Sequence, residues 1–262
     1  VERSGTGQKP LLGLFADGDM DFQVDRVNER RPTSTQQPSL ADMTRAALRR
    51  LKATGKPYCL LVEGSRIDHA LHSNDAASAA LDALAYDDMV REVLEEVRGG
   101  DAVEMLSVAD HSTGGLTLGM QETFDLDYAG GAGSWKTPPR KWRPEVLAET
   151  KMSTGLLAST LCCDPSAFST ADAARDLVSS SVGVTPSSDE LSLMIEARAR
   201  QSLPCAVAAA ASDWPRSSCG MGMQVILNKM VHTESGIATT TSGHTSEDIH
   251  VYAAGNNRRS FG

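Results

Sequence analysis

The segment LVEGSRIDHALH, residues 61–72, brings one glutamate, one aspartate and two histidines into a short stretch of chain. It overlaps the apolar run PYCLLV, residues 57–62, whose composition is typical of a buried β-strand. α/β proteins place their chemistry in the loops that follow such strands. The metal-binding side chains at this point therefore predict a functional site, provided that their spacing lets them meet.

The residues around this segment predict a βαβ unit. Apolar residues recur at helical spacing over residues 75–98, and AVEMLSV, residues 102–108, is typical of another strand. Two strands joined in this way are parallel, so their carboxyl ends lie at the same edge of the sheet. KPLLGLFA, residues 9–16, predicts a further short strand, and Ser39 is expected to cap the next helix together with Asp42.

The fold class that follows is α/β, with a parallel-rich central sheet flanked by helices. Residues 1–262 are expected to form one partial domain of this class. Residues from about 120 to 220 are rich in Ala, Ser, Thr and Pro and contain several helix-like segments, which predicts a helical insertion or subdomain. GMQVILNKMVH, residues 222–232, indicates a helix, and residues 236–255 indicate two short strands around a loop.

Composition excludes some classes of function. The chain has 262 residues and is 40% hydrophobic, which is sufficient for one large domain with a core. The formal net charge of −9 argues against non-specific nucleic-acid binding. The five cysteines include no Cys-X-X-Cys pair, which argues against a structural zinc site built from cysteines and leaves their pairing open.

Targeting signals are not evident in the sequence. No stretch approaches the roughly 20 apolar residues of a membrane-spanning helix. The first residues, VERSGTGQKP, lack the apolar centre of a signal peptide. We therefore expect a signal to be absent or to lie outside this sequence, and the compartment stays open.

Acidic and imidazole side chains are predicted to gather at one edge of the sheet. Asp68 and His72 are four residues apart, so they share one face of a helix. Asp110 and His111 follow the second strand, and His244 lies in a loop beside apolar residues. Taken singly, each is more often a cap or a loop hydrogen-bonding residue. Grouping several carboxylates without cations is costly, so the arrangement as a whole favours a divalent metal site.

Three segments resemble the metal-binding segments of the alkaline phosphatases: LVEGSRIDHALH, VADHSTGGLTLG and SGHTSEDIHVYAAG. LLGLFADGDMDFQVDR and PSLADMTRAALRRL are similar to the family's preceding segments. The resemblance covers about residues 11–119 and 222–255 and is weak over the insertion. It implies an alkaline-phosphatase-like fold, hydrolysis of small phosphate monoesters to inorganic phosphate, and an exported or cell-surface homodimer.

The resemblance also implies a role for individual residues. Asp68, His72 and His244 correspond to the ligands of a first zinc ion. Asp110 and His111 correspond to ligands of a second zinc ion.

Two further residues of the first segment correspond to family positions. Glu63 corresponds to a ligand of one magnesium ion, and an oxygen ligand suits that ion. His69 falls where the family carries a histidine or lysine near the substrate phosphate. The alternative for His69 is a polar residue on the outer face of the helix start.

The family's serine nucleophile, in an Asp-Ser-Ala motif, has no counterpart in the chain. In the family this motif precedes the segment that resembles residues 11–26, so the chain resembles the C-terminal part of an alkaline phosphatase. Three functions stay open: a phosphomonoesterase, another hydrolase of the superfamily acting on phosphodiesters or phosphonates, and a metal-binding fragment without turnover. No catalytic nucleophile is assigned.

Overall fold

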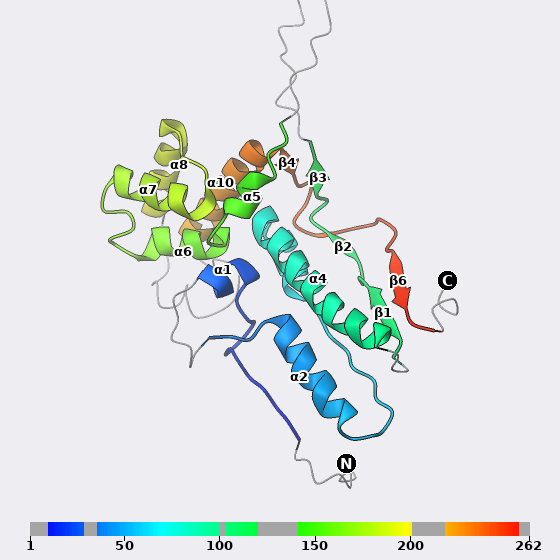
Figure 1. The fold of residues 1–262 in the computed structure, drawn as a ribbon. Helices are drawn as coiled ribbons and strands as arrows, with labels where there is room; N and C mark the ends of the chain where they lie inside the picture. Colours follow the sequence, from blue (N-terminus) through cyan, green and yellow to red (C-terminus); the bar gives the residue numbers. More distant parts are fainter. Residues whose placement is uncertain (1–9, 29–35, 100–102, 120–140, 201–217, 257–262) are drawn as a thin grey trace, which may run out of the picture.

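The computed structural model describes residues 10–28, 36–99, 103–119, 141–200 and 218–256 (Figure 1). The first four helices are α1 Gln23–Asn28, α2 Leu40–Lys52, α3 Arg66–His72 and α4 Ala76–Arg98. The later helices are α5 Glu145–Glu149, α6 Thr154–Cys163, α7 Ala171–Val182, α8 Ser188–Ala199 and α10 Ser218–Ser235. The strands are β1 Met105–Val108, β2 Ser112–Thr113, β3 Thr117–Leu118, β4 Ile237–Ala238, β5 His244–Thr245 and β6 Val251–Ala254.

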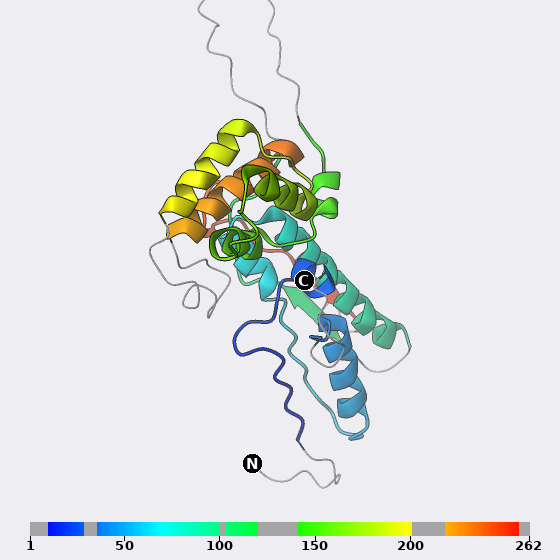
Figure 2. The same ribbon diagram turned by 90° about the vertical axis from the view of Figure 1, so that its left-hand side faces the viewer.

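The elements form two regions, which Figures 1 and 2 separate clearly. The helical lobe consists of α5 to α8 together with α10. The strand lobe consists of α1, α2, α3, α4 and the six strands, with α1 packed against α4 and α4 running beside the strands. None of the helices within the described residues has the length and apolar character needed to cross a bilayer.

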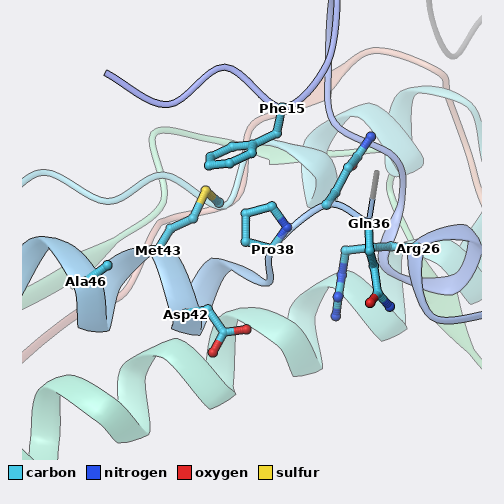
Figure 3. Close-up of a pocket in the computed structure, with 8 residues that line it drawn as sticks. Phe15, Arg26, Gln36, Pro38, Asp42, Met43 and Ala46 are labelled. Carbon is cyan, nitrogen blue, oxygen red and sulfur yellow. The ribbon is translucent and has the colours of Figure 1, made fainter. Parts of the chain in front are cut away.

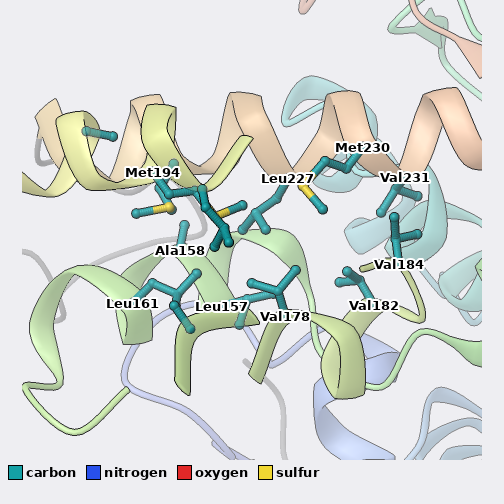
Figure 4. Close-up of a cluster of buried hydrophobic side chains, with 14 of the residues drawn as sticks. Leu157, Ala158, Leu161, Val178, Val182, Val184, Met194, Leu227, Met230 and Val231 are labelled. Atoms are coloured by element: carbon teal, nitrogen blue, oxygen red, sulfur yellow. The ribbon is translucent and has the colours of Figure 1, made fainter. Parts of the chain in front are cut away.

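The helical lobe is built on one apolar core (Figure 4). Leu157, Met194 and Leu227 are fully buried, and they come from α6, α8 and α10. Cys162 on α6 and Cys219 on α10 form a disulfide inside this core, and Cys163 is also disulfide-bonded. The helix-like segments expected in this region correspond to α5, α6 and α8, whereas α10, expected to belong with the sheet, completes the core.

Side-chain caps define several helix starts. Ser39 accepts a hydrogen bond from the Asp42 amide at 3.1 Å and donates to the Asp42 carboxylate at 2.7 Å, as the sequence predicts. Ser187 and Glu190 form a complete capping box at the start of α8. Each cap satisfies backbone amides that the first turn of a helix leaves without a carbonyl partner.

The expected parallel strand pair is wrong for the described residues. Residues 58–62 lie in no strand, and the stretch expected over residues 9–16 forms none within its described part. β1 instead pairs with β6, and this pair is antiparallel, as are β2 with β5 and β3 with β4. An apolar run fixes an extended backbone, but its hydrogen-bond partner is set by distant parts of the chain.

Residues 66–98 form two helices, and the second matches the helix expected over residues 75–98. α3 ends at His72, and α4 begins after Asp75, which caps it by accepting a hydrogen bond from the Ser78 amide at 2.9 Å. Between them, Asn74 has a φ of 56°. This left-handed conformation is open to asparagine at modest cost and turns the chain between the two helices.

Buried carboxylates join the two lobes at the start of α6. Asp25 of α1 accepts a hydrogen bond from the Ser153 amide at 2.8 Å. Asp75 accepts one from the Thr154 amide at 2.8 Å and one from the Thr154 hydroxyl at 2.9 Å. The amino terminus of a helix carries a partial positive charge, so it offsets part of the cost of burying these two side chains.

Candidate metal centre

Helix α3 presents the first two side chains of the centre. Asp68 and His72 are one turn apart, and Asp68 Oδ1 lies 3.4 Å from His72 Nε2. The helix begins just after Gly64, where an added Cβ would lie 2.8 Å from the Tyr86 ring of α4. The absence of a side chain at Gly64 thus allows α3 to start close against α4.

The pairing of β2 with β5 brings His244 to α3. Thr113 is directly opposite His244 in the antiparallel register, so both side chains point to the same face. The Gly114 amide donates to the Gly243 carbonyl at 2.9 Å, and the Gly114 carbonyl accepts from the Thr240 amide at 3.0 Å. Gly115 has a φ of 55°, and a Cβ there would collide with Thr240 Oγ1. This tight turn holds the loop that carries His244.

The hydrogen bonds of His72 determine which ring nitrogen faces the centre. His72 Nδ1 lies 2.6 Å from the Ser242 carbonyl oxygen. A carbonyl only accepts, so Nδ1 carries the proton and the lone pair of a neutral ring is on Nε2. That Nε2 lies 3.1 Å from His244 Nε2. A carbonyl that orients an imidazole in this way is typical of metal-binding histidines.

Thr113 links Asp68 to His111. Its hydroxyl lies 2.7 Å from Asp68 Oδ1 and 3.1 Å from His111 Nδ1. An ionised carboxylate only accepts, so Thr113 donates to Asp68 and accepts from His111 Nδ1. His111 Nε2 lies 3.1 Å from Asp110 Oδ2, so a ring proton or a cation must lie between these two atoms. The His111 ring also stacks on His244 with 3.5 Å between centroids.

The predicted ligands divide into three groups in the structure. Asp68, His72 and His244 each offer one ligand atom, and these atoms all lie within 4.8 Å of one another. Asp110 and His111 form the adjoining pair, although the Asp110 side chain is 85% exposed. Glu63 is exposed and takes part in no ion pair with another described residue, so the structure does not bring it into the cluster.

His69 lies in a separate group of side chains beside the centre. Its Nδ1 accepts a hydrogen bond from Arg66 Nη1 at 3.0 Å and lies 3.8 Å from Asp19 Oδ2. Arg66 is buried, with its guanidinium 3.7 Å from the centroid of the Phe22 ring. His69 therefore contacts charged groups, and the half-buried ring is not simply a solvated residue on the outer face of the helix.

The donor set fits a zinc ion. Two imidazole Nε2 atoms and one carboxylate oxygen converge, and these are the atom types that zinc binds in proteins. His72 Nε2 and His244 Nε2 lie 3.1 Å apart, so these two atoms share either a proton, as in a hydrogen bond, or a cation. Catalytic zinc sites commonly have three protein ligands, which leaves one coordination position for water or substrate.

Sequence reasoning missed three residues that organise the centre. Thr113 and the carbonyl of Ser242 orient two of the histidines, and Arg66 holds His69. The sequence offered a weak signal for Thr113, which stands two residues after His111. It offered none for Ser242, because a backbone carbonyl is present at every position.

A cavity elsewhere in the molecule contains none of the predicted metal ligands. It has a volume of about 520 Å³ and lies beside α2, with Phe15, Pro38 and Met43 among its lining residues (Figure 3). None of the predicted site residues lines it. The histidine cluster is therefore the better candidate for a functional centre.

Comparison with known proteins identifies relatives. Residues 2–138 match the alkaline phosphatase family. The chain is 30% identical to the repressible alkaline phosphatase of Saccharomyces cerevisiae, with 96% of this chain and 41% of the relative covered. It is 29% identical to alkaline phosphatase 4 of Bacillus subtilis, with 96% and 44% covered.

A solved structure is also similar. The cold-active alkaline phosphatase of a Shewanella species superposes with a TM-score of 0.69 and 26% identity, over 95% of this chain and 50% of that one. The fold is thus alkaline-phosphatase-like, as the resemblance of the segments implies. The chain spans less than half the length of the two curated relatives and half of this structure.

Proposed function

This chain belongs to the alkaline phosphatase family, and we propose that it supplies the zinc-binding part of a metal-dependent phosphate monoester hydrolase. The observation that carries the proposal is the convergence of one ligand atom each from Asp68, His72 and His244, all within 4.8 Å of one another. Family membership supports the reaction class, and the donor set supports zinc as the ion. The substrates on this proposal are small phosphate monoesters, and inorganic phosphate is a product.

Each side chain has a proposed task in this site. Asp68, His72 and His244 would hold one zinc ion, and Asp110 with His111 would hold a second. A bound zinc ion supplies Lewis-acid polarisation of a phosphoryl oxygen. The Ser242 carbonyl and the Thr113 hydroxyl keep protons on Nδ1 of two histidines, so that the Nε2 lone pairs face the site.

Two proposed roles depend on the family alone. Glu63 is proposed as a magnesium ligand, which requires movement of this exposed side chain toward the cluster. His69 is proposed to donate from Nε2 to the substrate phosphate, since Arg66 occupies its Nδ1. The side chains of Arg66 and Asp19 would together keep the His69 ring in that orientation.

A zinc titration tests the proposal. Metal-free chain 1–262 should bind zinc, measured by competition with a chromophoric chelator, and His72→Ala should weaken the binding at least 100-fold. His250→Ala is the matched control, because His250 is exposed and stacks edge-on with Tyr252 outside the cluster. Equal zinc affinity of the wild-type chain and His72→Ala would contradict the proposed site.

Turnover provides a second test. The chain has no Asp-Ser-Ala motif, so we expect phosphate release from an aryl phosphate by chain 1–262 to be several orders of magnitude slower than by a full-length relative. Fusion to the preceding part of a relative should restore turnover. Rapid turnover by chain 1–262 alone would mean that another residue is the nucleophile.

The compartment and assembly are also proposals. The Cys162–Cys219 disulfide supports an oxidising compartment such as the periplasm or the cell exterior. The family resemblance supports a homodimer. Sedimentation of the chain would test whether it forms a dimer. Quantification of its free thiols after isolation from cells would test whether the disulfide forms there.

A further inference from the structure

We propose that two residues of α10, Asn228 and His232, position the zinc ligands of α3 by holding the end of that helix. The inference rests on the proposed function, because it assigns a role toward the same metal centre. Neither residue belongs to the donor cluster. Both lie in the helix that forms the core of the other lobe, more than 150 residues along the chain from α3.

The end of α3 is a Schellman-type cap. Asn74, in the left-handed conformation, donates its amide to the Leu71 carbonyl at 3.0 Å. The Asp75 amide donates to the Ala70 carbonyl at 2.9 Å. This pair of bonds is the typical pattern for a helix that ends with a left-handed residue. His72 is the last residue of the helix, so its position depends directly on this cap.

α10 donates to two successive carbonyls of the cap. Asn228 Nδ2 donates to the Ser73 carbonyl at 2.7 Å. His232 Nε2 donates to the Asn74 carbonyl at 2.9 Å, since a carbonyl cannot itself donate. Asn228 and His232 are four residues apart, on one face of α10. Two donors one helical turn apart bind two successive carbonyls. They therefore fix both the position of the C-terminal end of α3 and its rotation about the helix axis.

The surroundings make these bonds rigid. Asn228 is only 7% exposed, and burial also lowers the pKa of His232, which favours its neutral ring. The apolar face of the same helix contributes Leu227, Met230 and Val231 to the helical core. α10 therefore links a well-packed core to the C-terminal cap of the helix that carries Asp68 and His72. A further polar residue of this face, Gln224, reaches Thr154 Oγ1 at 3.4 Å.

The test replaces the donors in chain 1–262 and measures metal binding. Asn228→Leu and His232→Leu remove the donors with little change in size, whereas His232→Gln keeps an N–H donor. Lys229→Ala, at an exposed position of the same helix, is the matched control. Zinc affinity is measured by chelator competition, and ligand geometry by the visible absorption of the cobalt-loaded protein. Far-UV circular dichroism establishes that each metal-free variant is folded.

We expect each leucine variant to bind zinc roughly 10-fold more weakly and to change the cobalt spectrum. His232→Gln should recover most of both signals, and Lys229→Ala should match the wild-type chain. Should Asn228→Leu fail to fold, Asn228→Ser, too short to reach the Ser73 carbonyl, must give the same loss. If the leucine variants kept the zinc affinity and the cobalt spectrum of the wild-type chain, the positioning role of Asn228 and His232 would be wrong, while the proposed zinc site would stand. A wild-type chain that binds no zinc would overturn the proposed function as well.

Discussion

In the helical lobe the buried side chains are mostly apolar and come from long helices, whereas the strand lobe places its candidate centre between a short helix and strands of two residues. Leu157, Met194 and Leu227 have almost no exposed surface. In the strand lobe, by contrast, Leu61 is 90% exposed and Val108 is 53% exposed. The first region is stabilised by burial of apolar surface, and the second by hydrogen bonds around polar groups.

The difference in packing between the two lobes explains how the cluster of histidines and carboxylates is held in place. Histidines and carboxylates brought together without a cation do not stabilise the elements that carry them. The strand lobe therefore depends on contacts with the helical lobe, through α10 and through the start of α6. Under the proposed function, a bound ion would add to these contacts. Changes in the helical lobe should alter global stability, and changes in the strand lobe should mainly alter metal binding.

The largest effect is expected from the disulfide inside the helical lobe. Cys162 and Cys219 are separated by 57 residues, so opening this bond releases a long loop in the unfolded chain. Chain-entropy arguments give a loss of roughly 4 kcal/mol. The double variant Cys162→Ala/Cys219→Ala should show this loss in urea unfolding followed by circular dichroism. Unchanged stability would mean that apolar packing alone holds α6 against α10.

The next largest loss of stability is expected from removing a buried leucine, and a neighbouring exposed leucine on the same helix controls for helix propensity. Leu157 and Leu156 are neighbours on α6, but Leu157 is fully buried and Leu156 is 42% exposed. Leu157→Ala should cost about 3 kcal/mol because it leaves a cavity in the core, and Leu156→Ala should cost well under half of that. Urea unfolding of both variants measures the difference. Equal losses would show that the core is less tightly packed at Leu157 than its burial indicates.

Zinc should stabilise the strand lobe by mass action. At a free zinc concentration about 100 times Kd, binding contributes about 2.7 kcal/mol. Calorimetry of the metal-free chain should show a higher melting temperature after zinc is added, and His72→Ala should abolish the increase. Hydrogen exchange should place the added protection in α3 and the β2–β5 pair. Protection confined to the helical lobe would contradict the division between the two regions.

Much of the helical structure could be predicted from local sequence. Ser39 and Asp42 identify the start of α2, and the apolar spacing over residues 75–98 matches α4, which spans Ala76–Arg98. Caps and helical periodicity depend on residues only a few positions apart. The strand expected over residues 58–62 failed because strand pairing depends on distant residues. The antiparallel partner of β1 lies in residues 251–254, which no local pattern identifies.

The candidate centre was likewise predictable only where it depends on residues close together in the sequence. The four-residue spacing of Asp68 and His72 required only helical geometry, which α3 provides. The approach of His244 to His72, across 172 residues, could be expected only from the family resemblance. Their roles as zinc ligands stay a prediction. The hydroxyl of Thr113 acts through its position between two other side chains, so only the three-dimensional structure reveals it.

A smaller effect, on pH dependence, tests the junction between the lobes. Asp25 is 8% exposed. Burial raises the pKa of Asp25 from 3.8 to about 7, with hydrogen bonds from Ser153 opposing the rise and the nearby carboxylates of Asp75 and Asp21 adding to it. The folded chain therefore binds more protons than the unfolded chain between pH 3.8 and about 7. This contribution to stability is full below pH 3.8 and is lost as the pH rises through about 7.

Asp25→Asn removes the titration while its amide oxygen can still accept from the Ser153 amide. The variant should be more stable than the wild-type chain at pH 8, by roughly 2 kcal/mol, and the difference should shrink toward pH 5. Burial raises the pKa of Asp82 to about 6 as well, so some slope of the same sign should remain in the variant. Asp87→Asn, at an exposed position of α4, is the control and should leave the profile unchanged. Urea unfolding at several pH values gives the free energies. A variant that is less stable than the wild-type chain at pH 8 would show that the ionised carboxylate of Asp25 stabilises the start of α6 more than its burial costs.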